Sequence, residues 1–510
     1  MTERIAVIDL GSNSARLIVM HVYKSGAYNL VYHQKEAVRL GQGIDAHNEL
    51  QPEAIDRTLA VLHTFAHMCQ LFQVDQILAV ATAAVRNARN GAAFIELVQQ
   101  QTEIPLRVIT GAEEAYLGYN GVINTIDISD ALLFDLGGGS MELTLIKDRK
   151  PQNMISLPFG AVTLTERFRT QDSISDSQYN ELHEFIVQGL AKVPWLKSTF
   201  LPLIGIGGTA RNLCKIDQRR KNYPTPKIHN YRMGVIAFNE IWKTLMKSSA
   251  SNRKKIPGLS SERADIILAG ATVIKCLFEV VRSDQFIASG CGVREGLFLR
   301  HYSTTRNLPD ITPDILTQST RNILLFYNGQ IEHTTHVATM AEALFDGWQL
   351  FHHLEPRDRI LLSVAAQLHD IGITINYYDH PRHSAYLIEN ARLFGLTHRE
   401  QILAALIAGW HNGLSAKYVR NRIYNEFLDE ADWQKARKMA LLLAMAETMD
   451  ATEMQLIKKV QASVFPGRAY LTLTASENIT IEYAALQKHA KWLKKEFNAE
   501  LDITIRQHSI

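Results

Sequence analysis

The sequence predicts an α/β protein with a duplicated two-lobed core, followed by an all-α domain and a small α+β C-terminal domain. Three observations carry this prediction. Strand-like and helix-like patterns alternate from the N-terminus to about His301, which is typical of α/β layers. One strand–turn–strand segment occurs twice, about a lobe apart. Apolar residues then recur almost wholly at helical spacing from Thr317 to about Met454.

Short apolar runs predict the strands, and longer runs with helical period predict the helices. The expected strands of the core are residues 5–9, 16–22, 76–81, 106–109, 131–135, 142–146 and 203–206. The expected helices are residues 52–72, 112–124, 177–193 and 260–281. Strand character returns near the end of the chain, where segments 469–474, 479–483 and 501–505 accompany a helix over 484–497.

A chain of 510 residues is too long for one ordinary hydrophobic core, so several domains are expected. Residues 302–313 are polar and contain proline, as a linker would be. We therefore expect one lobe over 1–125, a second over 126–302, a helical domain over 313–455 and a C-terminal domain over 456–510.

The composition is that of a globular protein, with 46% hydrophobic and 21% charged residues. No apolar run approaches the roughly 20 residues that a membrane-spanning helix needs, and the N-terminus has no signal-peptide pattern. Four separated cysteines without a CxxC pair suggest reduced thiols and a cytoplasmic location. A net charge of +2 gives no sign of nucleic-acid binding, so any polyanion would need local basic patches.

The repeated segment carries the chemistry. Residues 8–14 read IDLGSNS and residues 134–140 read FDLGGGS, each an apolar strand that ends in Asp before a Gly/Ser turn. Glycine lets backbone N–H groups approach phosphate oxygens, and Ser or Asn adds donors. The Asp residues could hold hydrated magnesium, which usually takes one or two carboxylates. A single turn of this kind is equally typical of an ordinary hairpin, but the pair predicts a phosphate clamp.

Three further segments follow predicted strands. The turn Gly205–Thr209 (GIGGT) could place a helix N-terminus against an anion, or simply connect a strand to a helix. Glu113 and Glu114 open the helix after Thr110; Glu113 is explained as a partner of the helix dipole, whereas Glu114 could be a general base toward water. Arg86 could donate two hydrogen bonds to a phosphate or could be a solvated surface residue.

These motifs together resemble the exopolyphosphatase/guanosine pentaphosphate phosphohydrolase family, of the actin–hexokinase–Hsp70-like superfamily. The resemblance also rests on ATAAVRNARN (81–90), TGAEEAYLGY (110–119), GIGGTAR (205–211), IPGLSSERAD (256–265) and SGCGVREG (289–296). It implies a ribonuclease H-like, actin-like fold for both lobes. The chain departs from the family pattern at Met141, where Thr is usual, and at Asn87, where an acidic residue is common.

The resemblance implies a role for each site residue. Glu114 would activate the attacking water, and Asp9, Asp135 and Glu142 would surround Mg²⁺. The residues that would bind the terminal phosphates are Ser12, Asn13, Ser14, Arg86, Gly137, Gly138, Gly139, Ser140, Gly207, Gly208 and Thr209. The expected activity is hydrolysis of terminal phosphoanhydride bonds of inorganic polyphosphate, and the alternative is removal of a phosphate from guanosine pentaphosphate (pppGpp). A kinase or ATPase, or a polyphosphate sensor without activity, is the remaining alternative.

Ten of the 19 histidines fall between His301 and His411, in the predicted helical domain. The order His333, His369-Asp370, His383, His411 and Asp450 resembles the H…HD…D order of the HD hydrolase superfamily. His333, His369, Asp370 and Asp450 could therefore bind a second divalent metal ion. A structural His/Asp network without metal is the simpler explanation of the same residues, and a second hydrolase activity is a further alternative.

Basic residues could guide a polyphosphate chain. Lys417 and Arg420 are the candidates in the helical domain, with Arg422 beside them and further clusters at 219–221 and 253–255. Each cluster could instead be solubilising surface charge. The resemblance also leads us to expect a homodimer.

Overall fold

We analysed a computed structural model of the protein, which describes residues 2–44 and 48–507. The chain divides into two compact units, one formed by Met1–Lys24 with Tyr28–Pro313 and the other by Ser25–Ala27 with Asp314–Ile510. The first unit holds the two α/β lobes, and the second holds the helical part and the C-terminal sheet. Each unit is described by itself below.

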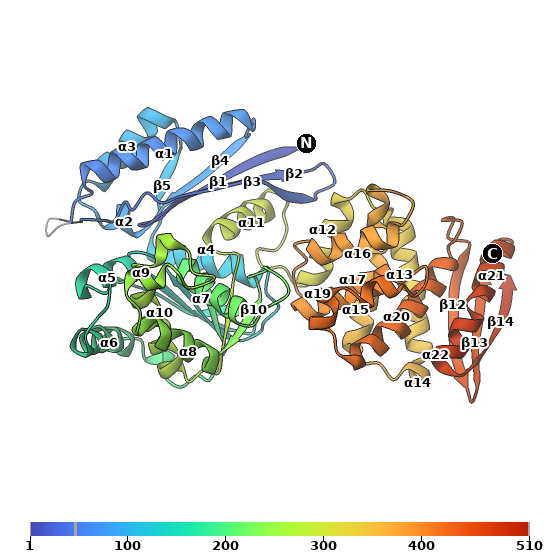
Figure 1. Cartoon of the computed structure of the whole chain (residues 1–510). Coiled ribbons are helices and arrows are strands. Elements are labelled where there is room, and N and C mark those ends of the chain that lie inside the picture. Colours follow the sequence, from blue (N-terminus) through green and yellow to red (C-terminus); the bar gives the residue numbers. More distant parts are fainter. Residues whose placement is uncertain (1, 45–47, 508–510) are drawn as a thin grey trace. The chain divides into compact units, whose positions relative to one another are not determined.

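Lobe I is a five-stranded sheet with the order β3-β2-β1-β4-β5. Its strands are β1 (Glu3–Leu10), β2 (Ala15–Val22), β3 (Tyr28–Glu36), β4 (Gln76–Ala81) and β5 (Leu106–Val108). Its helices are α1 (Pro52–Leu71), α2 (Ala83–Asn87) and α3 (Gly91–Thr102). Figure 1 shows α1 and α3 along one face of this sheet. Side chains alternate across β1, so that Ala6 and Ile8 join the core under those helices while Ile5 and Val7 join a core on the opposite face.

Lobe II repeats this arrangement with one strand added, in the order β10-β11-β9-β6-β7-β8. Its strands are β6 (Ala131–Leu136), β7 (Met141–Lys147), β8 (Lys150–Leu157), β9 (Leu203–Ile206), β10 (Tyr231–Gly234) and β11 (Gln285–Ala288). Its helices are α5 (Ala161–Phe168), α6 (Asp176–Ala191), α7 (Gly207–Arg220), α8 (Val235–Met246), α9 (Ala250–Arg253) and α10 (Ile267–Val281), with 3₁₀ turns at Pro194–Leu196 and Ser261–Arg263. In both lobes an antiparallel three-stranded meander precedes the parallel strands. This duplication confirms the predicted two-lobed fold.

Two helices connect the lobes. α4 (Gly111–Ile123) follows β5 and packs on β7 and β8, whereas α11 (Val293–Thr305) packs on β1 and against α4. The two helices approach backbone to backbone through glycine: a Cβ added to Gly296 would lie 1.9 Å from the carbonyl oxygen of Leu117, and one added to Gly121 would lie 2.3 Å from that of Gly292. Only glycine allows this approach, so α4 is held firmly where it enters the space between the lobes.

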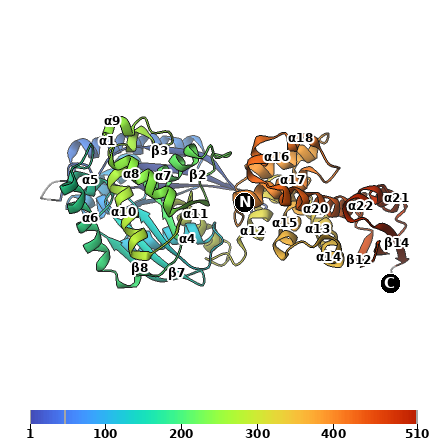
Figure 2. The ribbon, with the colours of Figure 1, turned by 60° about the horizontal axis from the view of Figure 1, so that its bottom comes forward.

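The second unit contains helices α12 to α20, the three-stranded sheet β12-β13-β14, and two helices beside that sheet. The bounds are α12 (Ile315–Phe326), α13 (Ile331–Gly347), α14 (Gln349–His352), α15 (Pro356–Leu368), a 3₁₀ turn (Ile371–Thr374), α16 (His380–Asn390), α17 (His398–Gly409), α18 (Ala416–Val419), α19 (Arg422–Phe427), α20 (Glu430–Thr448), β12 (Ile457–Phe465), β13 (Arg468–Ala475), α21 (Thr480–Lys488), α22 (Ala490–Phe497) and β14 (Glu500–Gln507). Figure 2 shows β12 and β14 beyond the helices of this unit. One continuous core runs from the helices into the sheet.

Three local predictions were wrong. Residues 479–483 begin a helix, because Ile479, Glu482 and Leu486 are the buried positions and their spacing is helical. The predicted helix over 260–281 begins with a separate 3₁₀ turn, and α10 starts only at Ile267. The expected linker at 302–313 is helical as far as Thr305, because Tyr302 packs in a core with Phe298.

Two simpler expectations hold. No helix in the described part of the chain is both long and apolar enough to cross a membrane. All four cysteines are buried, and no disulfide joins them. Cys291 lines the cavity between the lobes, whereas the other three cysteines do not.

Candidate active site

The two repeated turns face each other across one cavity. In lobe I the Gly11 N–H donates to the Ser14 carbonyl (3.1 Å), and in lobe II the Gly137 N–H donates to the Ser140 carbonyl (3.0 Å), so both turns close in the same way. A Cβ on Gly139 would lie 2.9 Å from Ser12 Oγ. The turns are therefore in van der Waals contact, and both line a cavity of about 90 Å³. The glycines of the second turn are required for this close approach.

The Asp that ends each repeated strand has a different cross-strand partner. Asp9 in β1 pairs with Arg16 in β2, whereas Asp135 in β6 pairs with Glu142 in β7. Lobe I therefore pairs a carboxylate with a guanidinium, and lobe II pairs two carboxylates. Burial, followed by repulsion from Asp9, raises the pKa of Asp135 to about 6. Burial, followed by repulsion from Asp135, raises the pKa of Glu142 to about 7.

These carboxylates fit a divalent cation. Glu142 accepts a hydrogen bond from Ser156 Oγ on one oxygen (2.7 Å), while its Oε2 is buried without a hydrogen-bond partner among the described residues. Asp9 and Asp135 both line the cavity, and burial raises the pKa of each. A bound cation would relieve the mutual repulsion of these buried groups, and oxygen ligands are those that Mg²⁺ prefers. Asp9, Asp135 and Glu142 are therefore suited to hold magnesium.

Glu113 and Glu114 are adjacent in sequence but face different surroundings. Glu113 closes a capping box at the start of α4: its carboxylate accepts from the Thr110 N–H (3.0 Å), and its own N–H donates to Thr110 Oγ1 (3.1 Å). Glu114 is only 8% exposed and lines the cavity. Burial and then the nearby charge of Glu142 raise the pKa of Glu114 well above that of an ordinary glutamate. A carboxylate with a raised pKa that lines such a polar cavity has the properties of a general base.

Arg86 lies beside Glu114. Its Nη1 donates to Glu114 Oε2 (2.9 Å) and to the Ile109 carbonyl (3.0 Å). The residue was predicted to bind phosphate, but in this structure its guanidinium contacts the carboxylate and does not line the cavity. Arg86 therefore orients Glu114 here, and phosphate binding by it stays a prediction.

Four arginines line the same cavity, namely Arg16, Arg211, Arg263 and Arg294. Burial, followed by the charge of Arg16, lowers the pKa of Arg211 to about 9 and that of Arg263 to about 10. Arg294 is 6% exposed, and its Nη1 has no hydrogen-bond partner among the described residues. Buried guanidinium groups without full pairing are a strong attraction for a phosphate.

Sequence reasoning missed all four of these arginines. Arg211, Arg263 and Arg294 do lie in the quoted motifs GIGGTAR, SSERAD and GVREG, where each follows a glycine or serine turn. That position was the available signal. Arg16 stands near the start of the mostly apolar strand β2 and gave no separate signal.

Only part of the third glycine turn lines the cavity. Gly207 and Gly208 begin α7 and line the cavity. A Cβ on Gly208 would lie 1.9 Å from Arg263 Cζ, so glycine here makes room for that guanidinium. Thr209 was predicted to bind phosphate, but it is fully buried and faces Gly270 in α10, 2.7 Å from the position of a Cβ there. The structure therefore places Thr209 in the core of lobe II, because the first turn of α7 directs that side chain away from the cavity.

The other predicted phosphate ligands lie where the turns place them. Ser12, Asn13, Ser14, Gly137, Gly138, Gly139 and Ser140 all line the cavity. The structure therefore brings the two turns, Glu114, Asp9 and Asp135 into one space, with Glu142 and Arg86 directly behind it.

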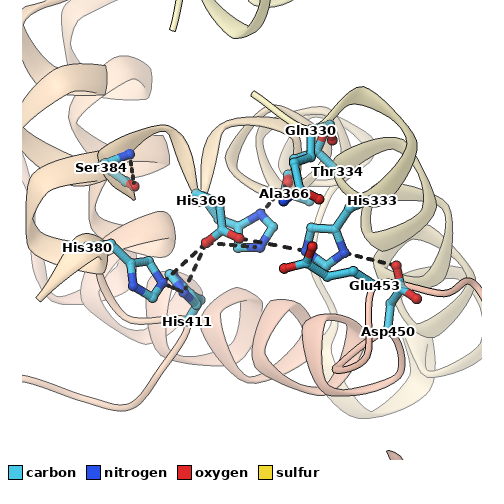
Figure 3. A network of polar contacts seen from close by, with 12 residues as sticks. Gln330, His333, Thr334, Ala366, His369, His380, Ser384, His411, Asp450 and Glu453 are labelled. Carbon is cyan, nitrogen blue, oxygen red and sulfur yellow. Dashed lines mark hydrogen bonds and ion pairs between the residues drawn. The ribbon is translucent and has the colours of Figure 1, made fainter. Parts of the chain in front are cut away.

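A separate polar network lies in the helical unit (Figure 3). Of the four residues predicted to form this site, His333, His369 and Asp370 lie close together. Asp450 lies behind His333, and its carboxylate contacts the Nδ1 atom of His333 at 2.9 Å. His411 and His380 complete the network, and His380 was missed by the sequence analysis. Burial lowers the pKa of His411 to about 3. His383 is not among the residues that the structure groups there.

The predicted basic clusters differ in their exposure to solvent. Lys417 and Arg420 are exposed, so a role in guiding polyphosphate stays a prediction. Arg253 is fully buried and donates to the carbonyls of Thr170 (3.1 Å) and Asp172 (3.0 Å), so it supports the fold of lobe II and is no part of a surface path.

The fold and this cavity define the class: a two-lobed protein of the actin-like fold with Asp-bearing turns from both lobes at its cleft. The sequence matches the model of the Ppx/GppA phosphatase family over residues 17–305 and that of Ppx/GppA phosphatase domain III over residues 315–498. The chain belongs to the Ppx/GppA phosphatase family.

Solved structures of similar proteins agree with this family. An exopolyphosphatase from Cytophaga hutchinsonii is 25% identical, with a TM-score of 0.56 over 61% of this chain and 100% of that chain. The PPX-GPPA enzyme of Aquifex aeolicus is 30% identical, with a TM-score of 0.51 over 58% of this chain and 99% of that one. Another structure of the Aquifex aeolicus family member is 29% identical, with a TM-score of 0.52 over 60% of this chain and 99% of that one.

Proposed function

We propose that this phosphatase hydrolyses the terminal phosphoanhydride bond of inorganic polyphosphate and releases orthophosphate. The observation that supports this most is the position of Glu114, whose buried carboxylate lines the same cavity as both phosphate turns. Glu114 would accept a proton from water as the water oxygen attacks the terminal phosphorus. The bond from that phosphorus to the bridging oxygen then breaks, and the shortened chain leaves with the bridging oxygen.

The other residues of the cavity would bind and orient the phosphate end. The N–H groups of the two turns and the four arginines supply donors for its oxygens, as phosphoryl transfer requires. Asp9, Asp135 and Glu142 would hold Mg²⁺, which when bound supplies positive charge for the phosphate oxygens. Arg86 keeps the Glu114 carboxylate directed by its 2.9 Å hydrogen bond.

A second candidate, removal of the terminal phosphate of pppGpp, has an observation in its favour. A cavity of about 490 Å³ adjoins the phosphate turns and shares Ser12, Gly138 and Gly139 with the first. Among the described residues its lining is mostly small and uncharged, with Glu166 and Arg167 as the charged members. Such a space would accept a nucleoside more readily than a long polyanion.

One experiment separates the candidates. Orthophosphate release is measured from long polyphosphate and from pppGpp at equal concentrations of terminal phosphate, with and without Mg²⁺. Faster release from polyphosphate supports the first proposal, and faster release from pppGpp supports the second. Binding of either substrate without release would indicate a sensor, and transfer of phosphate to an acceptor would indicate a kinase; both results would refute hydrolysis.

A further inference from the structure

A histidine, a cysteine and a glutamate meet where two helices of lobe II pack against each other. His183 lies on α6, whereas Cys276 and Glu279 lie on α10, which contacts α6. Residues three positions apart share one face of a helix, so Cys276 and Glu279 are neighbours. One nitrogen, the sulfur and one carboxylate oxygen of these residues all lie within 4.8 Å of one another. We call these three residues the α6–α10 cluster.

The distance between His183 and Glu279 fits two ligands of one ion better than it fits a hydrogen bond. His183 Nε2 lies 3.4 Å from Glu279 Oε2, whereas N–H···O hydrogen bonds are usually about 2.7–3.2 Å long. Zinc binds nitrogen and oxygen ligands at about 2.0–2.2 Å in tetrahedral geometry, so two such ligands are about 3.4 Å apart. An ion between these two side chains would therefore require little movement of either.

The two carboxylate oxygens of Glu279 have different partners. Lys275, one turn earlier on α10, donates to Oε1, and Oε2 is thereby directed toward His183. The Lys275 ammonium also lies 5.0 Å from the centre of the Trp242 ring, a cation–π contact that helps to hold the lysine in place. Glu279 thus presents one oxygen in a fixed direction, as a metal ligand must.

Cys276 supplies a sulfur ligand, which decides the kind of ion. Its side chain is fully buried in the core of lobe II, whereas the side chains of His183 and Glu279 are 33% and 47% exposed. An ion can therefore approach from the solvent side. Burial, with the charge of Glu279, raises the pKa of the thiol to about 12, so a bound ion must displace the thiol proton to water. Thiolate and imidazole ligands suit zinc, whereas magnesium prefers oxygen ligands.

We propose that the α6–α10 cluster binds one zinc ion through His183 Nε2, Cys276 Sγ and Glu279 Oε2, with water as the fourth ligand. Lys275 is a positioning residue for this site, because it orients Glu279. The ion joins two helices that are distant in the sequence, and it thereby stabilises lobe II. The site is independent of the proposed hydrolysis, since other residues line the cavity between the lobes.

Cobalt(II) tests the sulfur ligand directly. The full chain is stripped with a chelator, kept reduced without added thiols, and titrated with Co²⁺, which replaces zinc in such sites. A thiolate bound to Co²⁺ gives a near-ultraviolet charge-transfer band. Imidazole and carboxylate ligands do not give this band, so Co²⁺ bound elsewhere does not interfere. We expect the band in wild type, its loss in Cys276→Ser, and its disappearance when Zn²⁺ displaces Co²⁺.

Cys291→Ser is the matched control, because Cys291 lines the cavity between the lobes together with Asp9 and Asp135. This variant should keep the band. The absence of a band in wild type, or its loss in Cys291→Ser but not in Cys276→Ser, would overturn the proposal. A band that excess Zn²⁺ leaves unchanged would overturn the assignment to zinc.

Variants at the two exposed ligands keep the test valid if Cys276→Ser does not fold, which circular dichroism would show. His183→Gln and Glu279→Gln retain the thiol, and each should weaken Co²⁺ binding, measured by the titration of the band, by at least about 10–100-fold. Even the loss of an outer partner of a ligand has an effect of this size. Glu184→Gln removes the charge of the exposed residue beside His183 and should leave binding unchanged. Equal affinity in wild type and His183→Gln would also overturn the proposal.

Discussion

The Arg86 guanidinium joins the Glu114 carboxylate to the backbone of lobe I. A single nitrogen, Nη1, donates to Glu114 Oε2 at 2.9 Å and to the carbonyl of Ile109 at 3.0 Å. Ile109 immediately precedes the capping box of α4, so the arginine fixes the proposed base relative to the start of its own helix. Arg86 also lowers the pKa of Glu114, although burial raises that pKa more strongly.

Replacing Arg86 should change the pH dependence of the reaction. Without the guanidinium the pKa of Glu114 rises further, and the base must be deprotonated to act. We expect Arg86→Gln to move the acid limb of the kcat–pH profile to higher pH. Arg89→Gln, at an exposed position shortly after it, is the control and should leave that limb in place. An acid limb at the same pH in Arg86→Gln would show that Arg86 does not tune the base.

Glu114→Gln tests the base itself. The amide can still accept the hydrogen bond from Arg86, but it cannot take a proton from water. We expect kcat to fall by about 10²–10⁴-fold, with KM little changed. Glu113→Gln is a matched control in the same helical turn, because glutamine can also close the capping box. Full activity in Glu114→Gln, or an equal loss in Glu113→Gln, would refute the assignment.

Glu142→Gln should make the metal-free protein more stable at alkaline pH. Because the folded state raises the pKa of Glu142 to about 7, it favours the protonated carboxyl. The stability that this group contributes is present below its unfolded pKa and is lost as the pH rises through about 7. In a chelator, we expect the variant to exceed wild type by on the order of 1–3 kcal/mol at pH 8 and to match it near pH 5.

The same pair of proteins reports on magnesium. Added Mg²⁺ should raise the Tm of wild type more than that of Glu142→Gln, since ligand binding stabilises the folded state. Equal Mg²⁺ effects on both proteins would count against Glu142 as a metal-site residue. Thermal unfolding at several pH values, with chelator or Mg²⁺, measures both effects.

Gly208→Ala should weaken phosphate binding with little effect on the fold. Its Cβ would lie 1.9 Å from Arg263 Cζ, so this flexible side chain must move out of its position at the cavity. The loss of one charged contact corresponds to a rise in KM of about 10-fold or more, with a smaller effect on kcat. Gly234→Ala is the control, since its Cβ would meet only Asp284 O at 3.9 Å. An unchanged KM would mean that Arg263 does not contribute to binding.

Gly296→Ala should destabilise the α/β unit. The new Cβ would lie 1.9 Å from the Leu117 carbonyl oxygen, and two packed backbones have no room to separate. We expect a loss of about 1–3 kcal/mol or more, measured by urea unfolding. Gly118→Ala in α4 is the matched control and should cost less, because its Cβ would first meet the flexible end of Ile206 at 3.3 Å. Equal losses in the two variants would contradict the tight contact between the helices.

Much of the fold could be predicted because the repeated strands are unusually regular. Apolar runs that end in Asp9 and Asp135 mark β1 and β6, and their buried faces allow only one register. The segment 479–483 misled the prediction, since Ile479, Ile481 and Tyr483 alternate like a strand. Ile481 is in fact 63% exposed, because the core beneath selects the helical positions. Tertiary contacts decide such short segments.

The site could be predicted only where its residues lie close together in the sequence. The Asp-bearing turns and Glu114 occur in compact motifs, whereas the four arginines come from separate elements and meet only after folding. His380 escaped notice for the same reason, since it follows a 3₁₀ turn and no spacing rule links it to His411. Thr209 is a different case: its side chain is fully buried in the core of lobe II, so phosphate binding by this residue stays a prediction.

The four arginines that line the cavity affect the last step of the proposed reaction, the release of orthophosphate. Guanidinium groups attract a phosphate whether or not it is still attached to a chain. Released orthophosphate would therefore bind the same four arginines as the substrate, and it would compete with the next chain end for this site. The buried guanidinium groups that favour binding of the substrate would thus make the enzyme subject to inhibition by its own product.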